Sequence, residues 1–405
     1  MRVLILIMVL SVVSGYFILR GFATSNFERE NCEFNKCIEG IMLQFAIPGM
    51  ALAKINQGEI EFTKTFGFAN VAKGVEVNED TLFHVASISK PIMGLSLLQL
   101  VDNGLLDLDE DINSYLPFEV INPLFKDEKI TLRHLASHTS GIKDFHDPTT
   151  FIANKDPKIS LHRHLHSMLS IGGEKYEGGS YFFKQPPGYF RSYSNLASGL
   201  AGLLVESVTQ MPLSQYSDEF TLKPLGADRA FWRLNDTDFD NIAVPYELNV
   251  CLPDTEICTN GDNQELNDFI NEYVDFSPSN IRLIAYPHWG NPQYPEGGLR
   301  ASIDSLAHLM VSILNNQKAN GDMFLSPDTY AEMFHSQPNE KLAPRQRFFW
   351  RENSSGLIGH MGSDLGAFTA FYFDPHSKDG FIILINRSSD ERLAAAMTLI
   401  AKLLA

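Results

Sequence analysis

The sequence predicts an α/β (α+β) fold in which one lobe is assembled from both ends of the chain and a mainly helical lobe is inserted between them. Strand patterns occur near the two ends, at residues 49–67 and 365–385. The middle of the chain, over residues 130–230, has instead the pattern of helices and loops. The 405 residues suffice for one large domain or two lobes with a substantial core.

The strands near each end are predicted from short runs of β-forming residues. Residues 49–55 and 60–67 flank the turn signal Asn56-Gln57-Gly58, which predicts a hairpin. Residues 365–373 and 380–385 form two further strand patterns. We assign all four runs to the α/β lobe.

Helices are predicted from apolar residues that recur every three or four positions. Such a pattern runs from Ile92 to Leu105 and predicts a helix with one buried face, which starts after Ser87 and ends at Asn103-Gly104. Two further helices are predicted over residues 196–208 and 391–405.

The N-terminus has the pattern of a targeting segment. An uncharged, mostly apolar run from Val3 to Leu19 lies between Arg2 and Arg20. We expect residues 1–23 to be a cleaved signal peptide or, as the alternative, an uncleaved membrane anchor. The protein is then exported, either to the periplasm or by secretion, with a membrane tether as the alternative.

The four cysteines occur in two close pairs, Cys32 with Cys37 and Cys251 with Cys258. An even number of cysteines behind an export signal predicts two local disulfides, whereas a reducing compartment would leave four free thiols. Neither pair has the spacing of a zinc site, so no metal is predicted.

The formal net charge is −17, which argues against nucleic acid as a partner because no basic stripe is present to neutralise phosphates. It also gives no attraction to an anionic membrane surface. Residues 251–280 are acidic and lack Lys and Arg, which predicts an exposed excursion.

A candidate nucleophile lies at the start of the predicted helix. Ser87 and Lys90 are three residues apart, so their side chains share one helix face. A serine hydroxyl needs a base, and a buried lysine whose pKa is lowered by desolvation can act as that base. The same spacing recurs at Ser140 and Lys143, where a glycine turn would not align the two groups. Alone, the motif is more typical of a helix-capping serine and a solvated lysine.

Tyr193-Ser194-Asn195, at the start of the helix over residues 196–208, supplies groups that such a nucleophile needs. A tyrosine beside a cationic lysine can shuttle a proton, and the Asn195 amide can bond an acyl carbonyl and a lysine. The alternative is a helix-capping asparagine with a packed aromatic ring.

His360-Met361-Gly362-Ser363 lies just before the strand over residues 365–373. Gly362 would let a substrate backbone approach closely, and an edge strand would pair with an extended acyl chain. The backbone N–H of Ser363, with that of Ser87, would form an oxyanion hole. The alternative is a histidine in a turn before a core strand.

Taken together, Ser-x-x-Lys, Tyr-Ser-Asn and His-x-Gly resemble the serine β-lactamase and penicillin-binding protein superfamily. The Tyr-x-Asn form is similar to its class C β-lactamase, DD-peptidase and esterase branch. Residues 80–87, 130–141 and 296–302 also resemble family segments, so the likeness runs from Glu39 to the C-terminus. The resemblance implies a β-lactamase/transpeptidase-like fold, with an antiparallel sheet flanked by helices.

The resemblance also implies a domain organisation. A catalytic domain over residues 39–405 follows a polar lead-in at 24–38. Its α/β lobe comprises residues 39–85 and 295–405, and its helical lobe comprises residues 86–294.

The resemblance further implies a role for each motif residue. Ser87 is the acylated nucleophile, Lys90 is its proton partner, and Tyr193 passes the proton to the leaving group and later activates water. Asn195 holds the acyl amide, and the binding strand is lined by His360, Gly362 and Ser363. No metal or organic cofactor is expected, and the partner is a small-molecule or short-peptide substrate.

One motif departs from many β-lactamases, which carry Lys-Thr-Gly where this chain has His360-Met361-Gly362. A histidine is mostly neutral at pH 7, and Met361 lacks a hydroxyl, so recognition of a substrate carboxylate should be weaker. We therefore expect a hydrolase of D-amino acid peptides, D-amino acid amides or small esters that is poor as a β-lactamase. The alternative is a catalytically weak binding or sensor protein for cell-wall-type peptides or β-lactams.

The alternating histidines His162, His164 and His166 resemble a metal-binding tract. On a helix they would point to different sides, so we expect a solvated helix there.

Overall fold

The computed structural model describes residues 32–252, 255, 258–259, 280–336 and 342–404. The predicted targeting segment and most of the acidic excursion lie outside these residues. None of the helices in the described part of the chain is both long enough and apolar enough to span a bilayer.

The described residues fall into two compact units, one comprising residues 32–46 and 390–404 and the other residues 47–389. The smaller unit holds helices α2 (Phe34–Gln44) and α11 (Glu391–Leu404), which contact each other. The Cys32–Cys37 disulfide lies at the start of α2. Helix α11 confirms the helix predicted over residues 391–405.

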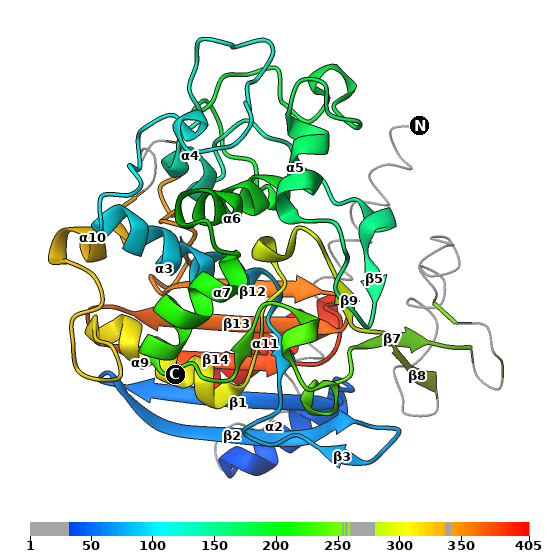
Figure 1. Ribbon diagram of the computed structural model, residues 1–405. Helices are drawn as coiled ribbons and strands as arrows, with labels where there is room; N and C mark the ends of the chain where they lie inside the picture. The colour runs from blue at the N-terminus through cyan, green and yellow to red at the C-terminus, as the bar shows by residue number, and fades with distance from the viewer. Residues whose placement is uncertain (1–31, 253–254, 256–257, 260–279, 337–341, 405) are drawn as a thin grey trace, which may run out of the picture. The chain divides into compact units, whose positions relative to one another are not determined.

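The larger unit is organised around a seven-stranded antiparallel sheet, whose strand order is β11-β12-β13-β14-β1-β2-β3 (Figure 1). Its strands are β1 (Gly49–Asn56), β2 (Glu59–Asn70), β3 (Val75–Glu76), β11 (Arg351–Glu352), β12 (Ile358–Asp364), β13 (Ala367–Asp374) and β14 (Asp379–Ile385). The pairing of β1 with β14, with Met50 opposite Ile385, joins the two ends of this unit. This confirms the predicted fold class and the sheet built from distant parts of the sequence.

The burial of the strands explains their order. Strands β1, β13 and β14 are buried along almost their whole length, as expected for runs of apolar residues at the centre of a sheet. Strand β2 is partly exposed and lies nearer the edge. Helix α9 (Ile303–Asn315) packs against β1, β2 and β14.

Strand β12 corrects one prediction. His360 was expected just before the strand over residues 365–373, with a turn there as the alternative, but it lies inside a strand of its own that pairs with β13. The turn lies at Leu365-Gly366, where Gly366 has a φ of 68°, a backbone conformation that glycine adopts most readily.

The remaining helices of the larger unit cluster around α6, which contacts α3, α4, α5 and α7 (Figure 1). Besides α6 (Asn195–Thr209) itself, they are α3 (Ser89–Asp102), α4 (Leu132–Ala136), α5 (Leu161–Leu169) and α7 (Leu213–Ser217). Helix α10 (Pro327–Glu332) contacts α3. Helices α3 and α6 confirm two predictions, but α3 is buried on nearly all sides rather than on one face. Leu105, expected on that face, follows the helix and is exposed.

Helix α5 corrects the prediction of a solvated histidine tract in part. His164 is buried, whereas the rings of His162 and His166 pack on Phe118. Over the described ranges, no group of three or more His, Cys, Asp or Glu side chains is arranged to hold a metal ion.

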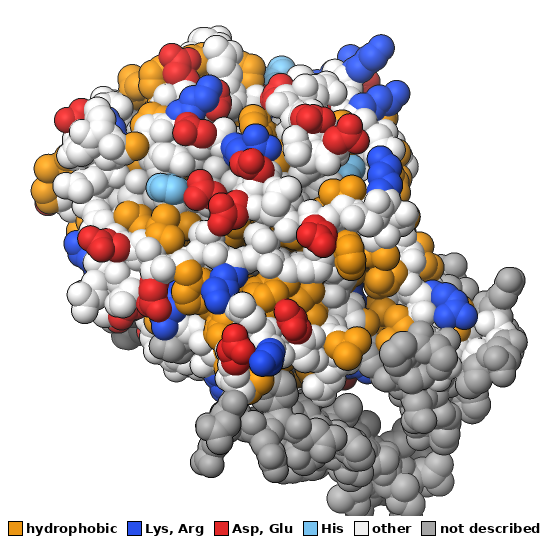
Figure 2. Space-filling view, turned by 90° about the horizontal axis from the view of Figure 1, so that it is seen from below, with side chains coloured by type: hydrophobic (Ala, Val, Ile, Leu, Met, Phe, Trp, Pro, Cys, Tyr) orange, Lys and Arg blue, Asp and Glu red, His pale blue; other side chains and the backbone are white. Residues whose placement is uncertain are grey.

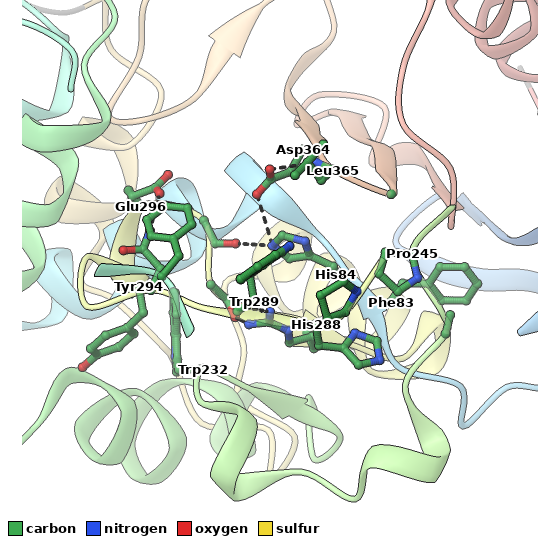
Figure 3. A pocket seen from close by; sticks show the side chains of 18 of the residues that line it. Phe83, His84, Trp232, Pro245, His288, Trp289, Tyr294, Glu296, Asp364 and Leu365 are labelled. Carbon is green, nitrogen blue, oxygen red and sulfur yellow. Dashed lines mark hydrogen bonds and ion pairs between the residues drawn. The ribbon is translucent and has the colours of Figure 1, made fainter. Parts of the chain in front are cut away.

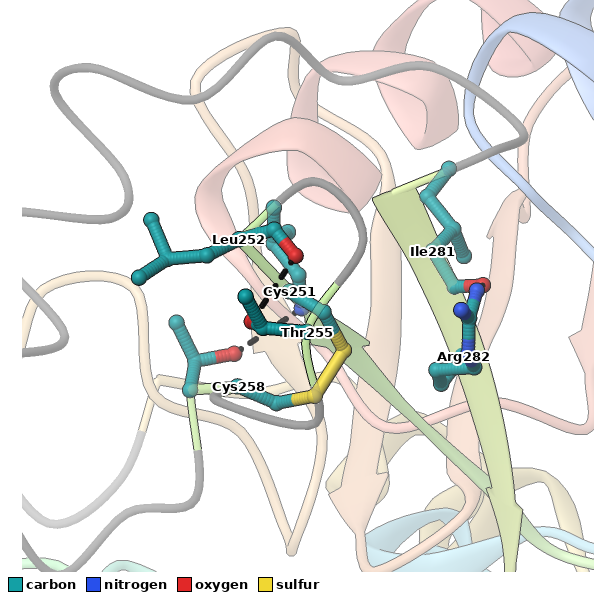
Figure 4. Close-up of a disulfide and its surroundings, with 8 residues drawn as sticks. Cys251, Leu252, Thr255, Cys258, Ile281 and Arg282 are labelled. Atoms are coloured by element: carbon teal, nitrogen blue, oxygen red, sulfur yellow. Dashed lines mark hydrogen bonds between the residues drawn. A yellow bond between two sulfur atoms is a disulfide. The ribbon is translucent and has the colours of Figure 1, made fainter.

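Short strands complete the larger unit. They are β4 (Phe83–His84), β10 (Arg300–Ala301) and β6 (Ala230–Phe231) in one small sheet, β5 (Ile152–Ala153) with β9 (Trp289–Gly290), and β7 (Tyr246–Val250) with β8 (Ile281–Ala285). The Cys251–Cys258 disulfide follows directly after β7, and Thr255 donates two hydrogen bonds to the Leu252 carbonyl beside it (Figure 4). Both predicted disulfides are thus present.

The charge on the surface is mixed rather than segregated. On the face shown in Figure 2, Lys and Arg side chains are interspersed with Asp and Glu and do not form a basic stripe. This face therefore offers no continuous basic track for a phosphate backbone.

We predict that Phe371→Ala destabilises the protein strongly. Phe371 is fully buried in β13 between the rings of Trp350 and Phe373, so the truncation leaves a cavity and should cost about 3–5 kcal/mol. Urea unfolding measures the change. Leu124→Ala, at an exposed position, should stay within about 0.5 kcal/mol of wild type, and equal effects for both variants would contradict the packing described.

Candidate active site

Ser87 lies in a tight turn between the small strand β4 and helix α3. The turn is a 3-10 helix, Ala86–Ile88, which continues directly into α3. Ala86 has a φ of 49°, in the left-handed region that residues other than glycine rarely adopt. Such a strained residue beside a reactive group is typical of a functional site. Lys90 follows on the first turn of α3, so the sequence motif spans the junction of turn and helix.

Ser87, Lys90 and Tyr193 come together at one point. Lys90 Nζ donates a hydrogen bond of 3.1 Å to Ser87 Oγ, and the Tyr193 hydroxyl lies 2.9 Å from the same oxygen. Lys90 Nζ also lies 5.0 Å from the centroid of the Tyr193 ring, within the range of a cation–π contact. Tyr193 precedes Ser194, the N-cap of helix α6, whose hydroxyl accepts from the Ala197 N–H, and this cap fixes the position of the tyrosine at the start of the helix.

Glu296 is a fourth member of this cluster, and sequence analysis missed it. Lys90 Nζ donates to the Glu296 carbonyl at 2.5 Å and to the Glu296 carboxylate at 3.3 Å. Lys90 is fully buried, and Glu296 is 7% exposed. Glu296 opens the segment 296–302 that resembles the family, but nothing in its spacing points to Lys90.

The protonation of Lys90 corrects another prediction. Burial of Lys90 is the largest influence and acts to lower its pKa, as expected. The Tyr193 phenol and the Glu296 carboxylate together more than offset burial, so the pKa of the Lys90 amine is raised above its ordinary value. The expected neutral lysine base is therefore not what the structure favours.

His138 packs against the other side of Tyr193 and was also missed. The two ring centroids are 4.4 Å apart, and the backbone N–H of Ser194 donates to His138 Nδ1. Burial, followed by the Lys90 cation, lowers the pKa of His138 well below its ordinary value, so its ring is neutral. A neutral ring there buttresses the tyrosine without adding charge.

Asn195 is placed close to the cluster, with its side chain held by Asp144. Its side-chain N–H donates to Asp144 at 3.2 Å, and its backbone N–H donates to the same carboxylate at 2.7 Å. The hydrogen bond from Lys90 that the sequence allowed is not formed, because the Lys90 ammonium is directed to Ser87 and Glu296. The Asn195 side-chain oxygen is buried and has no hydrogen-bond partner among the described residues.

Strand β12 passes directly beside the turn that carries Ser87. A Cβ atom on Gly362 would lie 2.2 Å from both the Val85 carbonyl oxygen and Thr369 Oγ1, so only glycine fits. The absence of a side chain at Gly362 therefore serves this close packing. Ser363 follows on the same strand, where its hydroxyl hydrogen-bonds to Ser389.

His360, also on β12, faces Tyr193 at a ring distance of 6.3 Å. Burial, followed by the Lys90 cation, lowers the pKa of His360 to about 4. Met361 next to it is partly exposed. This stretch of β12 therefore carries a neutral imidazole and a thioether.

A cavity of about 300 Å³ adjoins the cluster on the side of Glu296. Its walls include five aromatic side chains: Phe83, Phe151, Trp232, Trp289 and Tyr294. Its polar lining includes His84, which donates to the Gly297 carbonyl and lies 3.8 Å from Asp364 (Figure 3). Because Glu296 contacts Lys90 and also lines the cavity, the cavity and the Ser87 cluster share a wall.

The second Ser-x-x-Lys copy does not form a comparable cluster. Ser140 and Lys143 lie in a stretch without helix, and Lys143 Nζ donates to the carbonyl of Ser180. The helix that follows Ser87 is therefore what distinguishes the first copy of the motif from the second.

The antiparallel sheet and the helices around α6 define a protein with the β-lactamase/transpeptidase fold. The chain belongs to the Beta-lactamase family, which it matches over residues 34–405. This confirms the resemblance seen in the sequence motifs.

Individual relatives are distant. Protein flp of Staphylococcus aureus (strain N315) is 22% identical over 88% of this chain and 63% of its own length. A beta-lactamase of Yersinia enterocolitica is 28% identical over 53% of this chain and 50% of its own. The chain thus spans less than two thirds of the length of these curated relatives.

Solved structures share the fold at low identity. A D-amino acid amidase from Ochrobactrum anthropi SV3 superposes with a TM-score of 0.67, at 19% identity over 92% of this chain and 97% of that one. A beta-lactamase/D-alanine carboxypeptidase from Pseudomonas syringae gives a TM-score of 0.64, at 17% identity over 92% and 98%. These likenesses extend over nearly the whole of both chains.

We predict that stability falls as the pH drops from about 6.5 to 4, partly because of His360. Its folded pKa lies near 4 and its unfolded pKa near 6.5, so the unfolded chain binds the extra proton first; the contribution is fully present above pH 6.5 and is lost below it. Because His360→Gln removes this proton uptake, the free energy of unfolding of the variant should fall less over this pH range. The difference from wild type should be up to about 1.4 kcal/mol for each unit between the folded and unfolded pKa. Urea unfolding at pH 7, 5.5 and 4.5 measures the effect.

The matched control is His376→Gln, at an exposed position on the sheet-bearing unit. It should decline with pH as the wild type does. A His360→Gln curve parallel to that of the control would contradict a buried, neutral His360.

Proposed function

We propose that this protein cleaves an amide or ester bond through an acyl-enzyme on Ser87. The observation that carries the proposal is the approach of two proton-handling groups to one serine oxygen, Tyr193 at 2.9 Å and Lys90 at 3.1 Å. Both distances lie in the range of working hydrogen bonds at nucleophilic serines.

In the proposed reaction, Ser87 Oγ attacks the substrate carbonyl carbon. The serine proton passes to Tyr193, which acts in the proposed step as a phenolate: its own proton has been released to solvent beforehand, and the adjacent Lys90 cation stabilises the anion. Tyr193 then donates that proton to the leaving amine or alcohol as the bond to the carbonyl carbon breaks. A water molecule then attacks the acyl carbon and gives a proton to Tyr193, which passes it to Ser87 Oγ as the acyl–oxygen bond breaks, so that the acid is released and both Ser87 and the Tyr193 phenolate are restored.

The backbone N–H groups of Ser87 and Ser363 are the proposed oxyanion hole. Support comes from the close packing of β12 on the turn before Ser87, which brings the two backbones alongside each other. The free Asn195 side-chain oxygen is the proposed acceptor for an N–H of the acyl group.

The proposed substrates are D-amino acid peptides, D-amino acid amides or small esters, in the class C-like branch of the family. Support comes from Tyr193 as the phenol of the cluster and from the amidase and carboxypeptidase among the structural neighbours. The aromatic walls of the adjoining cavity would accept an apolar part of such a substrate. The neutral His360 offers no fixed cation to a substrate carboxylate, so β-lactams should be turned over poorly.

We also propose that the protein is exported. The two disulfides support an oxidising compartment.

We predict that a fluorophosphonate or labelled penicillin adds one covalent group per chain, on Ser87. Ser87→Ala should abolish labelling because the acylated oxygen is gone, and peptide mass spectrometry locates the adduct. The second Ser-x-x-Lys copy provides a matched control, since Ser140→Ala should label as the wild type does. Equal labelling of Ser87→Ala and wild type would rule out Ser87 as the nucleophile.

We predict that turnover of a p-nitrophenyl ester falls about 10²–10⁴-fold in Tyr193→Phe, because the ring remains but the proton relay is lost. A panel comprising a D-Ala-D-Ala peptide, a D-amino acid amide, an acetyl ester and a cephalosporin, each with a Ser87→Ala control, then identifies the substrate. The cephalosporin should be the poorest. Stoichiometric labelling with no turnover on any substrate would favour the alternative of a binding or sensor protein.

A further inference from the structure

The Lys90 side chain makes three hydrogen bonds in the structure, and two of them end on Glu296. The acceptors are Ser87 Oγ, the Glu296 carbonyl oxygen and a Glu296 carboxylate oxygen. A neutral lysine amine has two N–H groups, whereas the ammonium ion has three. Two N–H groups reach Glu296 in either form; the ammonium ion directs its third N–H to Ser87 Oγ, whereas a neutral amine would accept the serine O–H there.

Because Lys90 is buried, its charged form depends on a carboxylate partner. Lys90 is fully buried, and a buried ammonium without a counter-charge is strongly destabilised. In the described part of the chain, the carboxylate within 4 Å of Lys90 Nζ is that of Glu296. The other oxygen of this carboxylate accepts from Asn291 at 3.1 Å and lies 3.6 Å from His146, so the group is held at both ends.

The fold fixes Glu296 through the turn that carries it. The turn Tyr294–Glu296 packs against helix α6, where a Cβ atom on Gly202 would lie 2.4 Å from Pro295. The Tyr294 hydroxyl anchors the turn by donating to Glu206 at 2.8 Å. Helix α6 thus holds this turn and, at its other end, Tyr193.

The remaining titratable groups around this pair do not replace Glu296. His138 and His360 face Lys90, and both are neutral near pH 7 because burial lowers the pKa of each. Tyr193 faces Lys90 from α6. On the far side of Glu296, His146 and Asp364 act on the carboxylate rather than contacting the lysine.

We propose that Glu296 is a positioning residue that holds Lys90 as an ammonium ion against Ser87, so that Tyr193, and not Lys90, takes the serine proton. The catalytic part of this inference depends on the proposed function, whereas the charge state of Lys90 does not. In the reaction, Glu296 forms no bond to substrate and exchanges no proton. Its carboxylate keeps the lysine charged while the proton moves between Ser87 and Tyr193.

Lysine side-chain ammonium NMR on the full chain tests the charge state without any need for turnover. In ¹⁵N-lysine-labelled protein, a buried, hydrogen-bonded ammonium at Lys90, assigned with Lys90→Arg, should be observed at pH 8. In Glu296→Gln the same signal should be lost, or should titrate at least about one pH unit lower, because burial then acts without the carboxylate. Glu296→Asp keeps the charge and should retain the signal at least in part.

The matched control is Glu206→Gln, which changes a half-buried carboxylate on helix α6 that accepts from Tyr294 of the turn and does not touch Lys90. It should leave the ammonium signal unchanged, and circular dichroism verifies that each variant is folded. An unchanged signal and titration in Glu296→Gln, or a neutral Lys90 at pH 8 in the wild type, would overturn the proposal.

The pH–rate profile of ester hydrolysis tests the catalytic part. In Glu296→Gln, kcat should fall at least about 10-fold at pH 8 with KM little changed, and the alkaline limb should move down by at least about one unit. The profile of Glu206→Gln should coincide with that of the wild type. An alkaline limb that stays in place in Glu296→Gln would refute the positioning role. A wild type that is inert toward every substrate would instead refute the proposed function, and the NMR result would still decide the state of Lys90.

Discussion

Lys90 is a charged group with no access to water, and the arrangement of the site follows from keeping it paired. Helix α3 brings the lysine to Ser87, helix α6 brings Tyr193, and the turn packed on α6 brings Glu296. These elements are held by packing and hydrogen bonds outside the cluster, such as Pro295 against Gly202 and the bond from Tyr294 to Glu206. The geometry of the cluster therefore depends on the contacts of α6 with α3 and with the turn, which lie at the centre of the helical region.

The sequence predicted what is local and what is repeated in a family. Ser87 and Lys90 could be found from a spacing of three residues on one helix, and Tyr193, Asn195 and β12 could be found from motifs in a known order. Glu296 and His138 could not, because they reach the cluster through tertiary packing that no periodicity encodes. The prediction of a lowered Lys90 pKa was wrong for the same reason. The burial of Lys90 could be predicted from the sequence, but the carboxylate of Glu296 beside it could not.

The strands of the sheet could likewise be predicted only in part. Strands β1, β2, β13 and β14 were recognised because apolar runs and turn residues agree over their whole length. Strand β12 was indicated by the family motif but not by local signals, because its residues, from Ile358 to Asp364, include two glycines and an aspartate, which are poor β-formers. What makes it a strand is its pairing with β13, a long-range partner that outweighs local preference. The segment that lines the candidate site is thus the one that local signals describe least well.

The pairing of β1 with β14 has a consequence for how the molecule is made. Met50 and Ile385 are neighbours in the sheet, so β1 lacks one of its two partners until β14 has left the ribosome. Until then, the hairpin of β1 and β2 presents an apolar edge to its surroundings, and pairing of such wide sequence separation forms slowly. The nascent protein should accordingly depend on factors that shield exposed strands during synthesis, and shortening the chain before β14 should yield insoluble material rather than a smaller folded product.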